Sequence, residues 1–244
     1  MKAIILAAGY ATRLYPLTEN QPKPLLEVNK IPIIEHILEK LNTIKNIRDI
    51  YIVTNARFYD LFRTWHCNYT SPKNIVLLND GTTSNDDRLG AVGDIYHVIQ
   101  EKEINEDIVV IAGDNLFGFE LQQFITFSER NNSSSVAFCD LKDVEKVRRR
   151  FGVGVLQGEK LIGFEEKPLE PSSALASTAC YLFKKEDFQF IEKAMERGSA
   201  DNTGDFVKFL VHNSTVHGFV FDEHWFDIGS FESLKDAENL YKNI

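Results

Sequence analysis

The sequence predicts an α/β fold in which a mostly parallel central sheet is covered by helices on both faces and carries an inserted antiparallel portion. Apolar runs of strand length alternate with helical patterns through the first half, as expected of parallel strands buried on both faces. Residues 152–168 have the glycine-centred pattern of a hairpin. The 244 residues are enough to bury a substantial core.

The elements of the first half follow in order from the spacing of apolar residues. Strands are predicted at residues 3–6, 50–54, 75–78 and 108–114, the last being a continuous β-branched run. Helices are predicted between them, where apolar residues recur three and four positions apart: Ile33, Ile34, Ile37, Leu38 and Leu41; Phe58, Leu61 and Phe62; Leu89, Val92, Tyr96 and Ile99.

The second half is predicted to be more mixed. A hairpin turns around Gly158, and strands are expected at residues 177–183 and 216–221. Helices are expected at residues 186–195 and 203–211, and a closing helix contains Phe231, Leu234 and Tyr241. Because no linker, repeat or low-complexity tract divides the chain, we expect residues 1–244 to form one domain.

Charge and hydropathy exclude some classes of function. The net charge of −9 argues against general nucleic-acid binding but not against a small anionic substrate, because a few cations can dominate one cleft. The basic run at residues 146–150 is interpreted as a solvated hairpin edge, with a phosphate or partner contact as the alternative. No apolar run reaches the length of a membrane span, so no membrane partner is expected.

The cysteines indicate a reduced, cytoplasmic protein. Cys67, Cys139 and Cys180 show no CxxC spacing, and an odd number without pattern fits thiols packed as small hydrophobic groups. A zinc site built on His66 and Cys67 would lack the usual ligand spacing.

Arg13 and Lys23 stand on one long loop directly after the first predicted strand, which predicts an anion there. A glycine-containing turn after a strand binds phosphate through backbone N–H groups. Neither the GxxxxGK[ST] pattern nor the GxGxxG pattern is present, so this is not a P-loop or a dinucleotide fingerprint. Pro22 and Pro24 restrict the backbone on both sides of Lys23 and so help to place its side chain.

Two aspartates follow at positions where a ligand would bind. Asp114 ends an apolar strand, and it either caps the next helix or holds a cation. Asp227 precedes the last helix, where a helix-start acid is the alternative reading. Since Mg²⁺ takes one or two carboxylates plus substrate phosphates, the pair would suit that ion. Glu166 can accept hydrogen bonds from hydroxyl groups and Lys167 adds a charge, although an exposed hairpin end would look the same.

These motifs together resemble the sugar-1-phosphate nucleotidylyltransferases of the glucose-1-phosphate thymidylyl- and uridylyltransferase type. That family has a loop of pattern GxGTRLxPxT…KP, which is similar to residues 9–18 with Lys23 and Pro24. The later pieces occur in the same order: GDN at 113–115, FGV at 151–153, EEKP at 165–168 and WFDIGS at 225–230. The ordered set covers essentially the whole chain.

The resemblance implies a Rossmann-like three-layer α/β/α sandwich of the nucleotide-diphospho-sugar transferase kind, without a C-terminal β-helix extension. It also implies that a sugar 1-phosphate attacks the α-phosphorus of a nucleoside triphosphate (dTTP, UTP or CTP) and releases pyrophosphate. Asp114 and Asp227 would ligate Mg²⁺, and Arg13 and Lys23 would hold the triphosphate as catalytic residues. Positioning and charge neutralisation suffice for such a transfer.

The resemblance further implies where the two substrates lie. The nucleoside would lie near Leu6, Ala8, Gly9, Leu89 and Gly90. The sugar phosphate would lie near Gly152, Glu166, Lys167 and Thr178. The oligomeric state, monomer or homodimer, stays open.

The chain departs from the family pattern in two places. Ala11 replaces a glycine, so the loop backbone there is expected to avoid positive φ or to shift. Residues 79–90 differ from the stretch in which a glutamine reads the base, so thymine, uracil and cytosine all stay open. A cytidylyltransferase for another small phosphorylated acceptor, a non-catalytic nucleotide-sugar binding module and a glycosyltransferase are the alternative functions.

Overall fold

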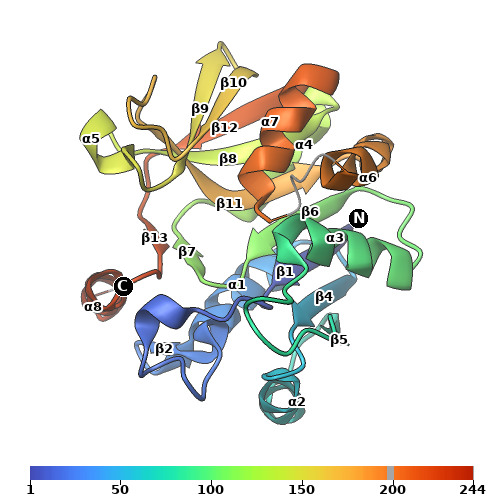
Figure 1. Ribbon diagram of the computed structural model, residues 1–244, viewed down its shortest axis with the longest axis vertical. Coiled ribbons are helices and arrows are strands. Elements are labelled where there is room, and N and C mark those ends of the chain that lie inside the picture. The colour runs from blue at the N-terminus through green and yellow to red at the C-terminus, as the bar shows by residue number, and fades with distance from the viewer. Residues whose placement is uncertain (197–200, 244) are drawn as a thin grey trace.

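Four strands of the first half lie side by side in parallel, as predicted (Figure 1). They are, in spatial order, β5 (Asn74–Asn79), β4 (Asp49–Thr54), β1 (Lys2–Leu6) and β6 (Ile108–Ala112). The structure is a computed structural model and describes residues 1–196 and 201–243. The carboxyl ends of these strands meet at one edge of the sheet, which is where parallel sheets bind ligands.

The other large strands continue this sheet and form a small closed barrel. They are, in spatial order, β11 (Leu175–Phe183), β8 (Ser134–Asp140), β12 (Val216–Phe221), β10 (Lys160–Glu166) and β9 (Gly152–Gln157). β11 pairs antiparallel with β6 and so joins the two halves into one nine-stranded sheet. β9 also pairs back to β11, with Val153 opposite Ala176, so the last five strands close on themselves.

The expected mostly parallel sheet is therefore found only in the first half, and the whole molecule has a mixed α/β fold. In the described barrel, β12 and β8 pair in parallel while the other pairings are antiparallel. β8 was not among the predicted strands because it begins with the buried Ser134 and Ser135, not with an apolar run. Their hydroxyl groups are satisfied from outside the sheet, which the sequence does not indicate: Ser134 donates to the Asp187 carboxylate in η3 (Lys185–Phe188), and Ser135 donates to the Ser133 carbonyl oxygen just before β8.

Side chains on alternate sides of the strands pack into two separate cores. Ala3 and Ile5 of β1 belong to one core and Ile4 belongs to the other, as the two-residue period of a strand requires. Helices α1 (Ile33–Thr43), α2 (Tyr59–Asn68) and α4 (Leu121–Asn131) contribute to the first core. Helices α3 (Gly90–Glu101), α6 (Gln189–Glu196) and α7 (Thr203–Asn213) contribute to the second.

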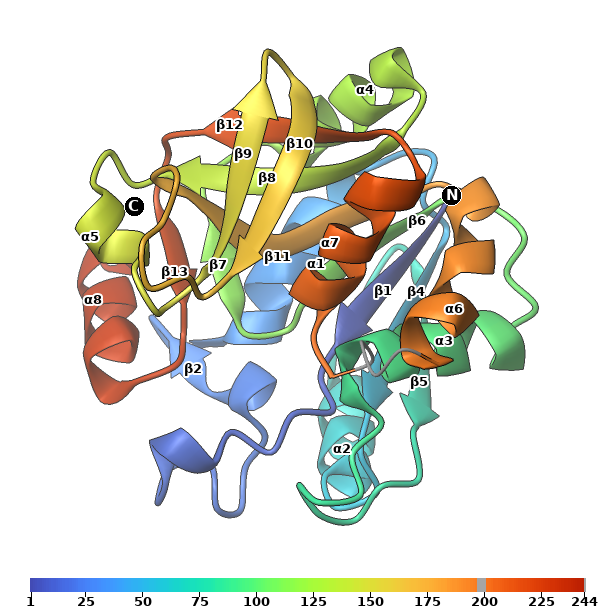
Figure 2. The ribbon, with the colours of Figure 1, turned by 45° about the horizontal axis from the view of Figure 1, so that its top comes forward.

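The remaining elements are short or lie at the rim. They are η1 (Thr12–Leu14), η2 (Lys23–Leu25), β2 (Glu27–Val28), β3 (Ile31–Pro32), β7 (Asn115–Phe117), α5 (Val144–Val147), η3 (Lys185–Phe188), β13 (Trp225–Asp227) and α8 (Phe231–Tyr241). In Figure 2, β13 lies beside β7, with which it pairs antiparallel. None of the described helices is both long enough and apolar enough to cross a membrane.

The predicted helices and strands are confirmed, with boundaries that differ by a few residues. The strand predicted at 108–114 ends at Ala112, because the chain turns at Gly113 and Asp114. The helix predicted at 186–195 begins as the 3₁₀ turn η3. The interpretation of residues 146–150 as a hairpin edge is wrong, since the run begins in α5 and continues through the turn before β9.

Candidate active site

The loop after β1 contains a left-handed residue that the sequence did not predict. Ala11 has φ 47° and ψ 40°, so the expectation that it avoids positive φ is wrong. Two hydrogen bonds to its carbonyl oxygen hold this conformation, one from the Thr18 hydroxyl at 2.7 Å and one from the Leu14 backbone N–H at 3.0 Å. For a residue with a Cβ atom, the left-handed region costs about 1–2 kcal/mol, which such contacts offset.

Lys23 and Asp114 form an ion pair at the carboxyl edge of the parallel strands. The Lys23 Nζ atom lies 2.6 Å from the Asp114 Oδ2 atom, and both side chains are partly buried. Lys23 begins η2, with Pro22 before it and Pro24 after it, so the backbone is restricted as expected. The side-chain amide of Asn115 donates to the other carboxylate oxygen at 3.1 Å.

Gly113 allows the two strand ends to come together just before Asp114. Its backbone N–H donates to the Leu6 carbonyl oxygen at 2.8 Å. A Cβ atom at this position would lie 2.9 Å from that oxygen and 3.1 Å from Pro24. Only glycine fits such a close backbone approach, and the result is that Asp114 is held beside the Lys23 loop.

Asp227 reaches the same place from the far end of the sequence. β13 pairs with β7 so that Asp227 lies opposite Asn115, and the Ile228 backbone N–H donates to the Asp114 carbonyl oxygen at 3.1 Å. Burial raises the pKa of the Asp227 carboxyl, and the neighbouring Asp114 carboxylate adds to that rise. The positive charges of Lys23, Arg13 and Lys167 act on Asp227 in the opposite direction, in that order. Five charged residues that are distant in sequence therefore share one electrostatic environment.

The helix-capping alternatives for the two aspartates are not borne out. The residue before α4 is Glu120, not Asp114. The cap of α8 is Ser230, whose side chain accepts from the Ser233 backbone while Ser233 bonds back. The carboxylates of Asp114 and Asp227 are thus not used at helix ends.

The two carboxylates suit a hard divalent cation. They are close like charges, one of them buried, and a cation between them would relieve the repulsion that raises the pKa of Asp227. No group of three or more acidic, histidine or cysteine side chains that could hold a metal occurs among the described residues. A site with two carboxylates is still sufficient for Mg²⁺, which takes its other ligands from water and substrate phosphates.

Glu166 lies between the hairpin and the start of α7. A Cβ atom on Gly204 would collide with the Glu166 Oε2 atom, and a Cβ atom on Gly152 would lie 3.1 Å from it. Burial raises the pKa of the Glu166 carboxyl, while Lys167, with its Nζ atom 3.5 Å from Oε1, opposes the rise. Lys167 also has a left-handed backbone, with φ 46°. Such strained conformations occur at functional sites more often than elsewhere.

A cavity of about 350 Å³ opens beside the ion pair. The sequence-predicted residues that line it are Leu6, Ala8, Gly9, Arg13, Lys23, Gly90 and Asp114. Leu89 is exposed just before α3 and is not part of the lining. Thr178 is buried, and its hydroxyl donates to the Ala137 carbonyl at 2.9 Å, so this hydroxyl is bonded inside the sheet and does not face the cavity.

Other residues of the lining were not found from the sequence. Asp80 follows β5 as Asp114 follows β6, so the rule that selected Asp114 could also have selected Asp80. Asp94 is an acid on the buried face of α3, and an acid among apolar helix positions is a detectable signal. Arg88 and Asp201 form a two-point ion pair at the rim, at 2.9 and 3.0 Å, which no local pattern predicts.

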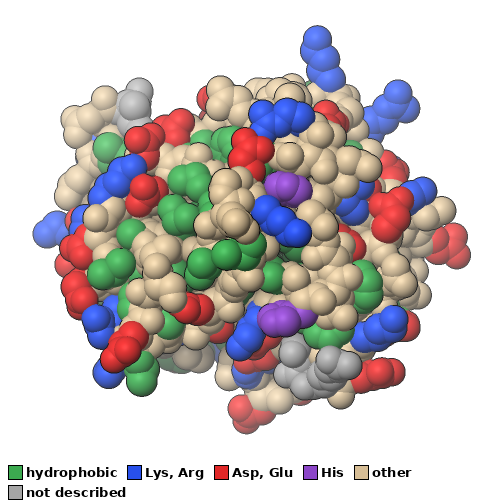
Figure 3. All heavy atoms as spheres, turned by 90° about the horizontal axis from the view of Figure 1, so that it is seen from above, with side chains coloured by type: hydrophobic (Ala, Val, Ile, Leu, Met, Phe, Trp, Pro, Cys, Tyr) green, Lys and Arg blue, Asp and Glu red, His purple; other side chains and the backbone are tan. Residues whose placement is uncertain are grey.

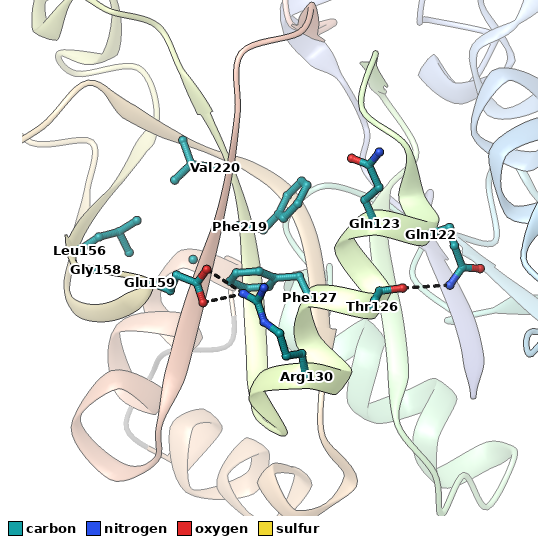
Figure 4. A pocket seen from close by; sticks show the side chains of 11 residues that line it. Gln122, Gln123, Thr126, Phe127, Arg130, Leu156, Gly158, Glu159, Phe219 and Val220 are labelled. Carbon is teal, nitrogen blue, oxygen red and sulfur yellow. Dashed lines mark hydrogen bonds and ion pairs between the residues drawn. The ribbon is translucent and has the colours of Figure 1, made fainter.

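A second and larger cavity, of about 540 Å³, lies outside the barrel (Figure 4). The Arg130 guanidinium bonds both oxygens of Glu159 at 2.7 Å across it, and Phe127 and Phe219 contribute apolar surface. It contains none of the residues that the sequence singled out for chemistry. Arg13, Lys23 and Asp114 line the smaller cavity and also act on Asp227, which is not part of that lining, so we take the smaller cavity as the candidate active site.

The chain belongs to the nucleotidyl transferase family, whose model matches residues 2–244. The bifunctional protein GlmU of Methanocaldococcus jannaschii is 33% identical over 236 residues, which are 94% of this chain and 51% of that protein. A putative mannose-1-phosphate guanyltransferase of Sulfolobus acidocaldarius is 28% identical over 94% of this chain and 60% of its own length. The chain thus spans about half the length of the curated relatives it matches.

A solved structure agrees with this assignment. The crystal structure of a putative glucose-1-phosphate thymidylyltransferase from Bacillus anthracis, in complex with sucrose, has a TM-score of 0.85. It is 28% identical, and the match covers 100% of this chain and 96% of that one. The resemblance to sugar-1-phosphate nucleotidylyltransferases is confirmed at the level of family and fold.

Proposed function

We propose that this protein joins a nucleoside triphosphate (dTTP, UTP or CTP) to a sugar 1-phosphate, giving a nucleotide-diphosphate sugar and pyrophosphate. The observation that carries the proposal is the convergence of Lys23, Arg13, Lys167 and Asp114 on Asp227. Two polyanions can approach each other only where their charge is neutralised. In the part of the chain that the structure describes, three cations and two carboxylates meet here.

The reaction needs positioning more than covalent chemistry by the protein. An oxygen of the sugar 1-phosphate forms a bond to the α-phosphorus, and the bond from that phosphorus to the β-phosphate oxygen breaks. Lys23 and Arg13 stabilise the negative charge that develops on the leaving pyrophosphate. Lys167 holds the sugar phosphate, and Glu166 accepts hydrogen bonds from sugar hydroxyl groups. A Mg²⁺ held by Asp114 and Asp227 would supply further charge neutralisation when bound.

The proposed partners are small molecules. The net charge is −9, and on the face shown in Figure 3 acidic and basic side chains are interspersed. A nucleic-acid partner would instead favour a broad basic surface. We therefore propose no nucleic-acid or membrane partner. The negative net charge is consistent with a site whose cations are concentrated in one cleft.

A substrate screen tests the proposed function. The protein is incubated with Mg²⁺, each common nucleoside triphosphate and a panel of sugar 1-phosphates, and pyrophosphate release is measured. Including other phosphorylated small alcohols separates sugar activation from transfer to a different acceptor. If the folded protein produces no pyrophosphate with any combination of substrates, the catalytic proposal is wrong. The remaining alternative is then a non-catalytic nucleotide-sugar binding module.

Substitution of the ion pair tests the assigned residues. We expect Lys23→Ala and Asp114→Ala each to lower kcat by several orders of magnitude, because each removes a charge from the reacting phosphates. Circular dichroism should show that both variants fold. Lys45→Ala, which removes an exposed lysine far from this loop in sequence, is the control and should keep wild-type turnover. Wild-type turnover in either test variant would remove that residue from the mechanism.

A further inference from the structure

An arginine and an aspartate from distant segments meet at the rim of the cavity beside Lys23, and both line it. Arg88 lies on the loop between β5 and α3, and Asp201 lies just before α7. The Arg88 Nε atom donates to Asp201 Oδ1 at 2.9 Å, and Nη2 donates to Oδ2 at 3.0 Å. The Ala91 backbone N–H also donates to the Asp201 carbonyl oxygen at 3.0 Å. A two-point contact of this kind fixes the plane of the guanidinium as well as its position.

The remaining nitrogen of this guanidinium is held as well. Arg88 Nη1 donates to the Asn85 backbone carbonyl oxygen at 2.7 Å, and Asn85 lines the same cavity. Because the N–H groups of a guanidinium lie in its plane, these bonds use its edges and leave its flat face free. The Arg88 side chain is 42% exposed, so that face can be reached by a ligand.

The loop that carries Arg88 is held in place by the preceding residue. The Asp87 carboxylate accepts from the backbone N–H groups of Thr83 and Ser84 at 3.0 and 2.7 Å. It also accepts from both of their hydroxyl groups. Arg88 is therefore positioned before any ligand arrives, and contact with its face requires little further ordering of the protein.

The shape of the cavity places Arg88 on the nucleoside side. Asp80 follows β5 and Asp114 follows β6, both line the cavity, and their strands are three strand spacings, or about 14 Å, apart. In the proposed function, the triphosphate binds Lys23 beside Asp114, and the sugar phosphate takes the barrel side. The nucleoside then extends toward the loop that follows β5, which carries Arg88.

The charge of Arg88 is less suited to the phosphates than the other cations of the site. The cations that act most strongly on Asp227 are Lys23, Arg13 and Lys167. The charge of Arg88 is opposed directly by Asp201, so its attraction for a polyphosphate is weakened.

We propose that Arg88 is the platform on which the nucleobase stacks, and that Asp201 is the positioning residue that holds this platform flat; the inference rests on the proposed function. A guanidinium plane stacks on aromatic rings, and bases stack on such planes. Because every base has a π face, this contact strengthens nucleotide binding without choosing among bases.

Binding of nucleotides is compared with binding of the phosphates alone. Dissociation constants for the Mg²⁺ complexes of UTP, CTP, dTTP, ATP and tripolyphosphate are measured by calorimetry with the whole protein. The ratio of the tripolyphosphate constant to the nucleotide constant measures what the nucleoside adds. Arg88→Ala should lower this ratio roughly tenfold or more for each nucleotide that the wild type binds, as expected for one lost base stack. Arg88→Lys should not restore it, because an ammonium group has the charge but no plane.

Asp201→Ala separates the platform from a simple charge effect. This variant frees Arg88 and removes a negative charge from the rim. If Arg88 served the phosphates, tripolyphosphate and nucleotides would bind more tightly by the same factor and the ratio would stay. We expect the ratio to fall, by a smaller factor than in Arg88→Ala. Asp86→Asn removes an exposed acid from the same loop, and Arg63→Ala removes an exposed arginine paired with Asp60 on α2. Both controls should keep the wild-type ratio.

The outcomes separate this inference from the proposed function. An unchanged ratio in Arg88→Ala overturns the platform, as does rescue by Arg88→Lys or a loss confined to one of several bound bases. An unchanged ratio in Asp201→Ala overturns the positioning role. Pyrophosphate release together with an unchanged ratio keeps the proposed function and removes the platform. A lowered ratio without pyrophosphate release from any sugar 1-phosphate does the reverse, and no nucleotide binding removes both.

Discussion

At the scale of single residues, burial makes the charges of the site depend on one another. The Lys23 side chain is 12% exposed and the Asp114 side chain 27%, so both charges of the pair are largely removed from water. Breaking a buried pair leaves an uncompensated charge, which is more damaging than loss of an exposed pair. Lys167 is 59% exposed and its contact with Glu166 is correspondingly weak, which leaves it available for an incoming phosphate.

The buried acid Asp94 makes stability depend on pH. Its pKa is raised from 3.8 to about 8, so between these values the folded protein holds a proton that the unfolded chain releases. Its contribution to the free energy of unfolding therefore falls as pH rises, by up to about 1.4 kcal/mol per pH unit. We expect Asp94→Asn to gain stability relative to the wild type between pH 5 and pH 8, measured by urea unfolding at both values.

The difference between the two proteins isolates Asp94 from the other titrating groups. Asp86→Asn is again the control, because Asp86 is exposed, and its curve should run parallel to that of the wild type. Identical pH dependence in Asp94→Asn and wild type would show that the buried acid keeps an ordinary pKa.

At the scale of elements, the position of the Glu166 carboxyl is set where the hairpin meets α7. β10 carries Glu166, β9 begins at Gly152, and Gly204 is at the start of α7. The space that the two glycines leave open is occupied by the Glu166 carboxyl and the Phe164 ring. The Glu166 side chain, which we propose binds the sugar, is thus positioned by backbone from two segments that are distant in sequence.

Gly204→Ala tests this positioning. The added methyl group would collide with the Glu166 Oε2 atom and would also lie 3.0 Å from the Phe164 ring, so the Glu166 carboxyl must move. We expect KM for the sugar 1-phosphate to rise about tenfold while KM for the nucleotide changes little, as measured by steady-state kinetics with each substrate varied. Gly163→Ala in the same hairpin is the control, because its methyl group would make an ordinary 3.5 Å contact with Val155. Equal changes in both KM values would argue against a separate sugar role for Glu166.

At the scale of the whole molecule, the site depends on the return of the chain's last segment to its first loop. One core cluster joins Leu14, Leu26 and Ile33 from the first segment with Ile228 and Ala237 from the last. Ile228 follows Asp227 directly and is fully buried. Packing of this cluster therefore determines whether Asp227 lies beside Asp114, although neither aspartate belongs to it.

Ile228→Ala should reduce stability and activity together. Removing a buried side chain of this size costs about 2–5 kcal/mol in the free energy of unfolding. Because the same residue anchors Asp227, we also expect a lower kcat at temperatures where the variant remains folded. Leu234→Ala, a partly buried position in the same cluster, is the comparison and should lose less of both. Full activity in folded Ile228→Ala would mean that β7 alone positions Asp227.

Most elements and the charged residues of the site could be predicted because they leave local signals. The spacing of apolar residues predicts the strands and helices of the first half. Asp114 is predicted as a ligand-binding residue because it follows a strand. Lys23 is identified by its prolines and by the motif around it. The Ser134 strand and the acid pair Asp80 and Asp94 were missed, because serines and acids usually mark exposed positions.

Local chemistry along the chain was thus enough to indicate an α/β protein with an anion-binding loop, two rim aspartates and a family resemblance. Closure of the barrel, the left-handed backbone of Ala11 and the raised pKa of Asp94 depend on the folded chain. The physical reason is that burial, strand pairing and the field of neighbouring charges come from segments far apart in sequence. No window of consecutive residues contains that information.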